Sequence, residues 1–291
     1  MKRLIDNSHG RPGRMAWMLA ACLGSAAALA QADPAAQAAA AVQRVDGAFI
    51  SANAAKTPDW PTIGVDYAET RYSRLDQINA TNVKDLGLAW SYNLESTRGV
   101  EATPVVVDGI MYVSASWSVV HAIDTRTGNR IWTYDPQVDR STGFKGCCDV
   151  VNRGVALWKG KVFVGAWDGR LIALDAATGK EVWQKNTFEG QKGSLTITGA
   201  PRVFKGKVII GNGGAEYGVR GYITAYDAET GEQKWRWFSV PGDPSKPFED
   251  ESMKRAARTW DPSGKWWEAG GGGTMWDSMT FDAELNTMYV G

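Results

Sequence analysis

The stretch AIDTRTGNRIW at residues 122–132 returns as ALDAATGKEVW at 173–183 and as AYDAETGEQKW at 225–235. The shared pattern is A-x-D-x-x-T-G-x-x-x-W, and its aspartates lie 51 and 52 positions apart. A weaker copy ends at Leu88-Ala89-Trp90. A period near fifty residues is typical of propeller blades or of a solenoid. The repeat therefore predicts a fold built from similar units in a row.

Each copy has the composition of a tight β-hairpin. Its Asp can hydrogen-bond the backbone two residues on, and its Gly permits the positive φ that such a turn needs. Runs rich in β-branched and aromatic residues precede the turns at 109–113, 161–165 and 207–211, and these runs predict strands. Three or four short strands per period make one blade, and the recurring Trp is expected to dock on the neighbouring blade as a flat ring. We therefore predict an all-β propeller.

The overall composition excludes several classes of protein. The 291 residues include 32 Lys or Arg and 32 Asp or Glu, so no excess of basic charge points to nucleic acid. The 33 glycines and 14 tryptophans fit a fold with many turns and large packing anchors. His9 and His121 are the two histidines, and no C-x-x-C-H sequence occurs. A His-rich zinc or iron site and an attached haem are thereby excluded for the chain as given.

The first thirty residues predict a secretory signal peptide. Basic residues precede the apolar run 15–30, which ends in Ala28-Leu29-Ala30. A transmembrane helix needs about 20 apolar residues, so we expect cleavage and no stable membrane insertion. A retained anchor and a lipoprotein signal at Cys22 are the alternatives. Residues 31–291 are then the exported part, and it begins with an Ala-rich tail and a loop-like stretch to about Leu75.

Two adjacent cysteines, Cys147 and Cys148, are the cysteines of this exported part. Adjacent Cα atoms lie about 3.8 Å apart across a trans peptide, below the usual disulfide span of roughly 4.4 to 6.8 Å. A strained disulfide between neighbours and two separate thiols are both open from the residues alone.

Four motifs in order resemble the quinoprotein alcohol dehydrogenases. They are the Trp repeat, the cysteine pair followed by DVVNRG at 149–154, GNGGAEYGVRGY at 211–222, and GGGTMW at 271–276. The resemblance spans about residue 58 to the end. It implies a periplasmic eight-bladed β-propeller that uses pyrroloquinoline quinone (PQQ) and calcium, of which this chain holds about the first half. The series WDSMTFD at 276–282 is most similar to the soluble quinohemoprotein ethanol dehydrogenase branch.

The resemblance also implies how the cofactor is held. A Cys147–Cys148 disulfide would lie on one face of the flat quinone and Trp276 on the other. Arg153 would pair with a PQQ carboxylate, and Glu101 would lie beside it. For Trp276 the alternative is one more blade-docking ring, and for Glu101 it is a solvated acid. The glycines at 270–273 are interpreted as letting the backbone approach a ligand. Further polar contacts are expected from Thr198, Gly213, Gly214, Ala215 and Thr274.

Glu216 is the predicted metal ligand. Calcium takes six to eight oxygens, and a bidentate Glu with an amide oxygen and quinone oxygens would fill that shell. The alternative is a surface Glu paired with Arg220. Whether a lanthanide replaces calcium is left open.

The implied activity is oxidation of a primary alcohol to an aldehyde, with electrons passed to cytochrome c or another acceptor. Residues 31–291 have room for about four blades, and the sequence stops within the strand-like run 286–291. We therefore expect the catalytic base, the amide ligand of the metal and any haem c domain to lie beyond Gly291, and we expect residues 31–291 alone to associate and to be inactive. The alternative function is a non-catalytic propeller scaffold resembling the outer-membrane assembly lipoprotein. The sequence does not identify the alcohol.

Overall fold

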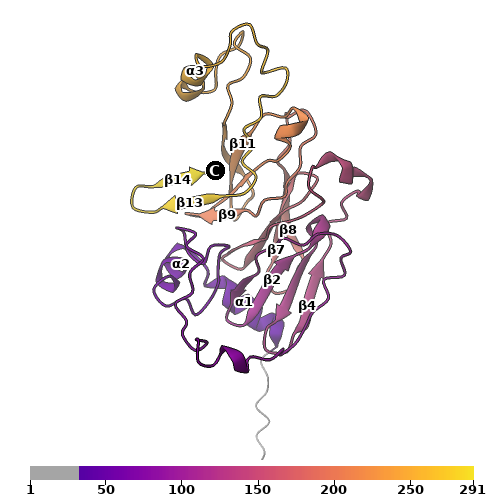
Figure 1. The fold of residues 1–291 in the computed structure, drawn as a ribbon, viewed down its shortest axis with the longest axis vertical. Coiled ribbons are helices and arrows are strands. Elements are labelled where there is room, and N and C mark those ends of the chain that lie inside the picture. Colours follow the sequence, from indigo (N-terminus) through magenta and orange to yellow (C-terminus); the bar gives the residue numbers. More distant parts are fainter. Residues whose placement is uncertain (1–32) are drawn as a thin grey trace, which may run out of the picture. The chain divides into compact units, whose positions relative to one another are not determined.

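The computed structural model describes residues 33–291, so the predicted signal peptide at 1–30 lies outside the described residues. Three antiparallel sheets of four strands, β1–β4, β5–β8 and β9–β12, and a two-stranded sheet, β13–β14, make up the fold (Figure 1). Within each sheet the strands follow one another in chain order. The all-β prediction is confirmed. The strand bounds are β1 Val105–Val107, β2 Ile110–Ser114, β3 Val120–Asp124, β4 Asn129–Tyr134, β5 Ala156–Trp158, β6 Lys161–Gly165, β7 Arg170–Asp175, β8 Glu181–Asn186, β9 Arg202–Phe204, β10 Lys207–Gly211, β11 Tyr222–Asp227, β12 Gln233–Phe238, β13 Met279–Asp282 and β14 Thr287–Val290.

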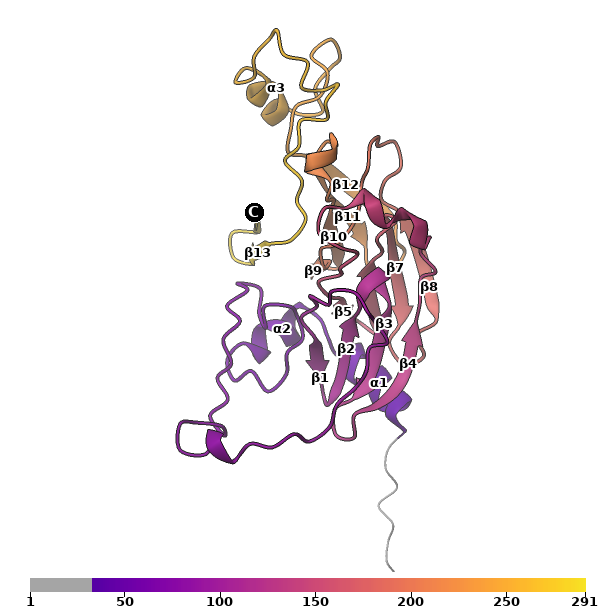
Figure 2. The same ribbon diagram turned by 45° about the vertical axis from the view of Figure 1, so that its right-hand side comes forward.

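The repeated phrase occupies the same place in each four-stranded sheet. It starts in the third strand, turns, and ends in the fourth strand, while the predicted apolar runs form the second strands β2, β6 and β10. The Ala and the Trp of the phrase face each other across the hairpin in all three copies. The first strands β5 and β9 contact each other, and the fourth strand of each sheet lies at its opposite edge (Figure 2). Each copy of the repeat is therefore one blade.

The turns use the Asp and the Gly as predicted. Asp175 accepts hydrogen bonds from the backbone amides of Ala177 and Thr178 at 3.1 and 2.9 Å. Asp124 likewise accepts from the backbone amide two residues on, that of Arg126, and also from the Arg126 guanidinium. The guanidinium hydrogen bonds and the amide hydrogen bond hold the pKa of the Asp124 carboxyl below its usual value. The turn glycines have φ values of 72°, 69° and 68° at Gly128, Gly179 and Gly231.

The first two blades are each docked to the next blade by a Trp that lies on the repeat turn of that next blade. Trp132 donates its indole N–H to the carbonyl of Ala176 at 3.0 Å, and Trp183 donates to Ala228 at 3.3 Å. A Cβ on Gly179 would lie 2.7 Å from the Trp132 ring, so the turn glycine also makes room for the indole. The predicted docking role of the repeated Trp is confirmed for these two. Trp235, in the last four-stranded sheet, is 37% exposed.

The weaker copy of the repeat, residues 88–90, supplies a docking Trp but does not belong to a four-stranded sheet. No strand is assigned between residues 86 and 94, and much of this stretch is exposed. Trp90 nevertheless donates to the carbonyl of Thr125 at 2.7 Å and packs on Gly128 as the other tryptophans pack on their glycines. Residues 86–94 therefore lie against the first sheet as the fourth strand of one blade lies against the next blade. The described residues form three four-stranded blades and one two-stranded sheet.

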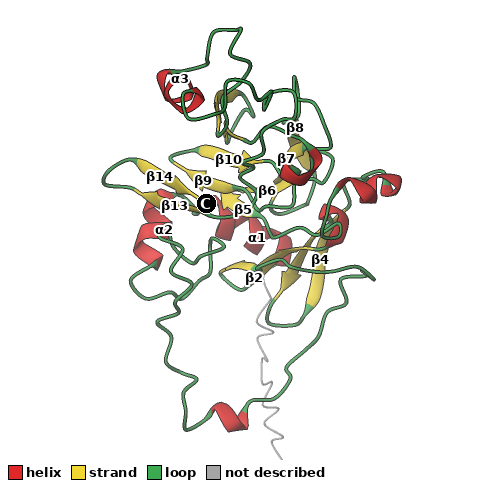
Figure 3. Ribbon diagram, turned by 45° about the horizontal axis from the view of Figure 1, so that its top comes forward, coloured by secondary structure: helices red, strands yellow, loops and turns green. Residues whose placement is uncertain are grey.

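Three short α-helices accompany the sheets in residues 33–291, and two of them correct the expectation of an Ala-rich tail and loop. Helix α1 spans Pro34–Gln43 and helix α2 spans Gly47–Asn53, and a third, α3, spans Glu251–Ala257. Asp33 caps α1 by accepting from the amide of Ala35, and the alanines that follow have high helix propensity. Helix α1 contacts β2 and β5, which buries one face of it (Figure 3). No helix among residues 33–291 is long and apolar enough to cross a membrane.

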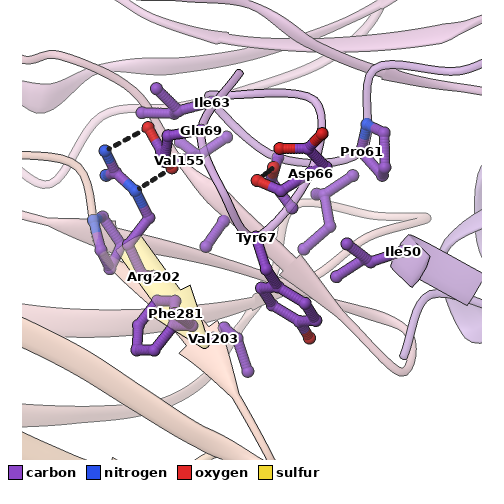
Figure 4. Close-up of a pocket in the computed structure, with 14 residues that line it drawn as sticks. Ile50, Pro61, Ile63, Asp66, Tyr67, Glu69, Val155, Arg202, Val203 and Phe281 are labelled. Carbon is purple, nitrogen blue, oxygen red and sulfur yellow. Dashed lines mark hydrogen bonds and ion pairs between the residues drawn. The ribbon is translucent and has the colours of Figure 1, made fainter. Parts of the chain in front are cut away.

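A segment at residues 60–69 crosses the first strands of successive sheets. Trp60 pairs with Val106 in β1, and the carbonyl of Tyr67 accepts from the amide of Phe281 in β13 at 2.9 Å. Between these points the segment packs around a small cavity beside β5 and β9 (Figure 4). There Glu69 accepts from the guanidinium of Arg202 at 2.8 and 3.3 Å, and both side chains are largely buried. The stretch predicted as a loop thus ties the sheets together.

Candidate cofactor site

The predicted site residues gather around one cavity of about 390 Å³. Its walls come from loops that lead into β5, β9 and β13 and from loops that follow β6 and β10. Glu101 is the predicted residue outside this lining, and it contacts the lining residue Arg153. The residues that were predicted to form one site therefore lie together in the structure, while the role of each residue stays a prediction. The predicted residues that line the cavity are Cys147, Cys148, Arg153, Thr198, Gly213, Gly214, Ala215, Glu216, Thr274 and Trp276.

Cys147 and Cys148 form a disulfide on one wall of the cavity, with their Cα atoms 3.8 Å apart. The pair follows the 3-10 helix Arg140–Lys145. Gly146 precedes it and lies directly against Trp167, because a Cβ on Gly146 would be 2.2 Å from that ring. Trp167 is buried, so it gives the disulfide loop a rigid surface to rest on. The expected vicinal disulfide is confirmed.

Trp276 is the exposed aromatic ring of the lining, with 46% of its surface accessible. Its backbone is pressed onto the loop that leads into β9, since a Cβ on Gly199 would lie 2.1 Å from the Trp276 carbonyl oxygen. A Cβ on Gly211 would lie 2.0 Å from the carbonyl oxygen of Met275. Unlike the docking tryptophans, Trp276 donates to no turn carbonyl within residues 33–291. Trp276 thus lacks the hydrogen bond by which Trp132 and Trp183 dock, and its role at the cavity stays a prediction.

The glycine run before Trp276 has a different use from the one expected. Gly270 to Gly273 all have positive φ, and these residues are absent from the cavity lining. Gly272 instead accepts from the amide of Gly221 at 2.7 Å, and a Cβ on Gly221 would lie 2.0 Å from the carbonyl oxygen of Gly273. The close backbone approach is made to the third sheet and not to a ligand. It places Thr274 and Trp276 at the cavity.

Arg153 is the cation of the cavity and is held from three sides. Its guanidinium bonds to Glu101 at 2.8 Å, and its centre lies 4.6 Å from the centroid of the Trp276 ring. Its backbone amide donates to the carbonyl of Thr198 at 3.0 Å. The side chain of Arg153 is 20% exposed and that of Glu101 is 43% exposed. Glu101 is therefore a partner of the cavity cation and not merely a solvated acid.

Glu216 lies in the one-turn 3-10 helix Ala215–Tyr217, between two left-handed glycines, Gly214 and Gly218. Its side chain is exposed at the cavity. The proposed alternative, a pair with Arg220, is wrong, because Arg220 binds Glu249 at 2.6 and 3.1 Å. Within residues 33–291 no group of three or more His, Cys, Asp or Glu could hold a metal ion. A cation at Glu216 would thus need oxygens from other sources.

Sequence reasoning missed Asp149, which also lines the cavity. Asp149 has a φ of 71°, a backbone conformation that is uncommon outside glycine. Hydrogen bonds from the Arg98 guanidinium and from the amide of Gly99 lower the pKa of the Asp149 carboxyl to about 2. The available signal is its place directly after the cysteine pair. Thr196 was also missed, and its carbonyl accepts from the amide of Gly213 at 2.8 Å.

Four-stranded blades docked by tryptophans, with a cavity at the ends of their first strands, define a β-propeller. Residues 60–291 match the PQQ family, described as the glucose/ethanol/alcohol dehydrogenase β-propeller domain. This match covers most of the chain, and the chain belongs to that family.

The relatives are longer than this chain. The quinohemoprotein alcohol dehydrogenase of Comamonas testosteroni is 94% identical over 291 residues, which are 100% of this chain and 41% of that protein. Its crystal structure matches with a TM-score of 0.88 and 96% identity, covering 89% of this chain and 38% of that one. The 1-butanol dehydrogenase (cytochrome c) of Thauera butanivorans is 65% identical over 207 residues, or 71% of this chain and 30% of that protein. The chain thus spans less than half the length of these relatives, and the predicted resemblance to the quinohemoprotein branch is confirmed.

Proposed function

We propose that the complete protein oxidises a primary alcohol to an aldehyde with PQQ bound in this cavity. The observation that carries the proposal is the lining: a disulfide and a guanidinium from the loop before β5 and an exposed indole from the loop before β13 meet around one space. The Comamonas and Thauera relatives are named as alcohol and 1-butanol dehydrogenases. These names favour an enzyme over the scaffold alternative.

The residues of this chain would bind and orient a flat, anionic group. The Trp276 ring and the disulfide offer surfaces that shield its two faces from water. Arg153 offers the planar, bidentate donors that suit a carboxylate. Because Glu101 already fixes this guanidinium, little side-chain freedom is lost when a carboxylate binds. The backbone of Gly213 to Ala215 and the hydroxyls of Thr198 and Thr274 would supply the remaining polar contacts.

We propose Glu216 as the ligand of this chain to calcium. Calcium prefers carboxylate and carbonyl oxygens, and Glu216 is exposed at the cavity beside the backbone of Gly213 to Ala215. When bound, PQQ with its metal supplies a polarised quinone carbonyl that accepts the hydride of the alcohol. No residue of this chain is proposed as the base that takes the alcohol proton. Titration of the complete protein with calcium and with a lanthanide would show which of the two metals it binds.

We further propose export to the periplasm and electron transfer to cytochrome c or to a haem c of the complete protein. The vicinal disulfide fits an oxidising compartment. The name of the Thauera relative includes cytochrome c, and that of the Comamonas relative includes a haem. Residues 1–291 contain no C-x-x-C-H haem attachment sequence, so a haem c would be attached to another part of the complete protein.

The test uses the complete protein prepared without cofactor. Addition of PQQ and calcium chloride should produce reduction of an artificial dye that depends on ethanol or 1-butanol. PQQ alone should produce much less. Failure of dye reduction with every primary alcohol, in a folded protein that has taken up PQQ, would contradict the proposal.

A further inference from the structure

We propose that Asp149 is a positioning residue that holds the Cys147–Cys148 disulfide and the Glu101 loop in register for cofactor binding. The proposal rests on the proposed function for its ligand, although its structural part does not. Asp149 follows Cys148 directly and lines the same cavity.

The Asp149 carboxylate is an acceptor for three donors on two loops. Oδ1 accepts from Arg98 Nε at 2.7 Å and from the amide of Val150 at 2.7 Å. Oδ2 accepts from the amide of Gly99 at 3.0 Å. Hydrogen bonds to a charged carboxylate are stronger than neutral ones. Two of the donors belong to the loop that carries Glu101, so Asp149 attaches the disulfide loop to that loop.

A second ion pair joins the same two loops, and in this pair the first loop supplies the acid and the second loop the base. Glu101 of the first loop binds Arg153 of the second at 2.8 Å, and the amide of Thr103 donates to the carbonyl of Arg153 at 3.2 Å. Two ion pairs therefore join the two loops. In one, Arg98 of the first loop binds Asp149 of the second, and in the other, Glu101 of the first loop binds Arg153 of the second. The disulfide lies at the Asp149 end of this arrangement and the cavity cation at the other.

The backbone conformation of Asp149 supports the positioning role. A non-glycine residue with positive φ costs free energy, and it persists where its surroundings hold it in place. On its far side the chain is fixed, because Val150 is fully buried and its carbonyl accepts from the amide of Trp117 at 2.9 Å. On the near side Gly146 rests on the Trp167 ring, while the 3-10 helix before it has no buried residues. The direction of the disulfide therefore depends on Asp149 together with this one packing contact.

An effect on global stability is not what this geometry predicts. The side chains of Arg98 and Asp149 are 50% and 30% exposed, and such pairs contribute little to folding. The effect should fall on the disulfide and on the cavity. The proposal therefore predicts weaker cofactor binding and a less protected disulfide without a loss of global stability, whereas a general structural role predicts a loss of stability.

The test compares Asp149→Asn, Asp149→Gly and Asp139→Asn in the complete protein without cofactor. Asp139 is the control, because it also caps a backbone amide in the segment before the disulfide but lies outside the cavity lining. Asp149→Gly removes the carboxylate and also relieves the positive φ, so it separates anchoring from strain. Arg98→Gln tests the partner loop. Each protein is measured for melting temperature, for PQQ affinity by equilibrium dialysis, and for the rate at which a phosphine reduces the disulfide.

We expect both Asp149 variants to bind PQQ about tenfold more weakly and to lose the disulfide faster, with melting temperatures close to that of the wild type. Arg98→Gln should show the same changes to a smaller extent, and Asp139→Asn should behave as the wild type. Wild-type reduction rates in both Asp149 variants would overturn the proposal. If the wild type itself binds no PQQ, the proposed function fails, whereas the reduction rates still decide the role of Asp149.

Discussion

The guanidinium of Arg153 lies 4.6 Å from the centroid of the Trp276 ring, although the two residues come from loops that lead into β5 and β13. A guanidinium at this distance from an indole gains a cation–π interaction. The same guanidinium binds Glu101 at 2.8 Å. The cavity therefore has a fixed cation beside its exposed aromatic ring before any ligand arrives, which is the arrangement that a planar carboxylate ligand requires.

Gly179 should tolerate no side chain. Its φ is 69°, and a Cβ would meet the Trp132 ring at 2.7 Å, so Gly179→Ala combines backbone strain with a clash. We expect a loss of about 2 to 4 kcal/mol of unfolding free energy in urea titrations. Gly206→Ala is the matched control, because Gly206 has a φ of 71° but nothing within 4 Å of the added atom. Equal losses for the two variants would show that the Trp does not dock on the turn.

Arg202 should matter more than any exposed ion pair. Its side chain is 5% exposed and its partner Glu69 is 13% exposed (Figure 4), so Arg202→Met leaves a carboxylate largely buried without its main partner. We expect a loss of about 3 to 5 kcal/mol, measured as the change in unfolding free energy. Lys254→Met removes the exposed pair with Glu251 and should change stability by less than about 0.5 kcal/mol. A loss for Arg202→Met as small as that of the control would contradict a role for the buried pair.

His121 should make stability fall in mild acid. Burial holds the pKa of His121 below its ordinary value of 6.5, while the charges of Glu95 and Arg130 act in opposite directions. The unfolded chain then takes up the proton more readily, so the stabilisation is present above about pH 6.5 and is lost as the pH falls below it. Urea midpoints should decrease from about pH 7.5 to 5.5, and His121→Gln should flatten this decrease. An equally steep decrease in the variant would show that other groups cause it.

Glu216 should govern metal affinity and not folding. Its side chain is exposed in a short loop, so Glu216→Gln should leave the melting temperature of the metal-free protein unchanged. The calcium concentration needed for half-maximal activity of the complete protein should rise by about tenfold or more. Glu232→Gln, in an exposed turn away from the cavity, is the control. An unchanged calcium requirement would show that Glu216 is not a ligand.

The repeated hairpins and the residues of the sequence motifs were predicted from the sequence. Features that depend on packing between segments far apart in the chain were missed. The hairpins at Asp175 and Asp227 follow from local turn chemistry, so their positions were predicted correctly. The Ala-rich start of the described chain was expected to be a tail, because nothing local shows that α1 packs on β2 and β5. The glycines before Trp276 were correctly seen as a close approach, but the sequence could not show that the third sheet is the surface approached. Asp149 was missed because its partners, Arg98 and Gly99, lie some fifty residues earlier.

The measurement that tests the account most directly is the affinity of the complete apoprotein for PQQ in equilibrium dialysis with calcium. The central claim is that PQQ binds between the disulfide and Trp276. Trp276→Ala should therefore weaken binding by about tenfold or more. Trp237→Ala removes an indole that is 38% exposed on β12, outside the cavity lining, and should bind PQQ as the wild type does. Wild-type affinity in Trp276→Ala would contradict the claim.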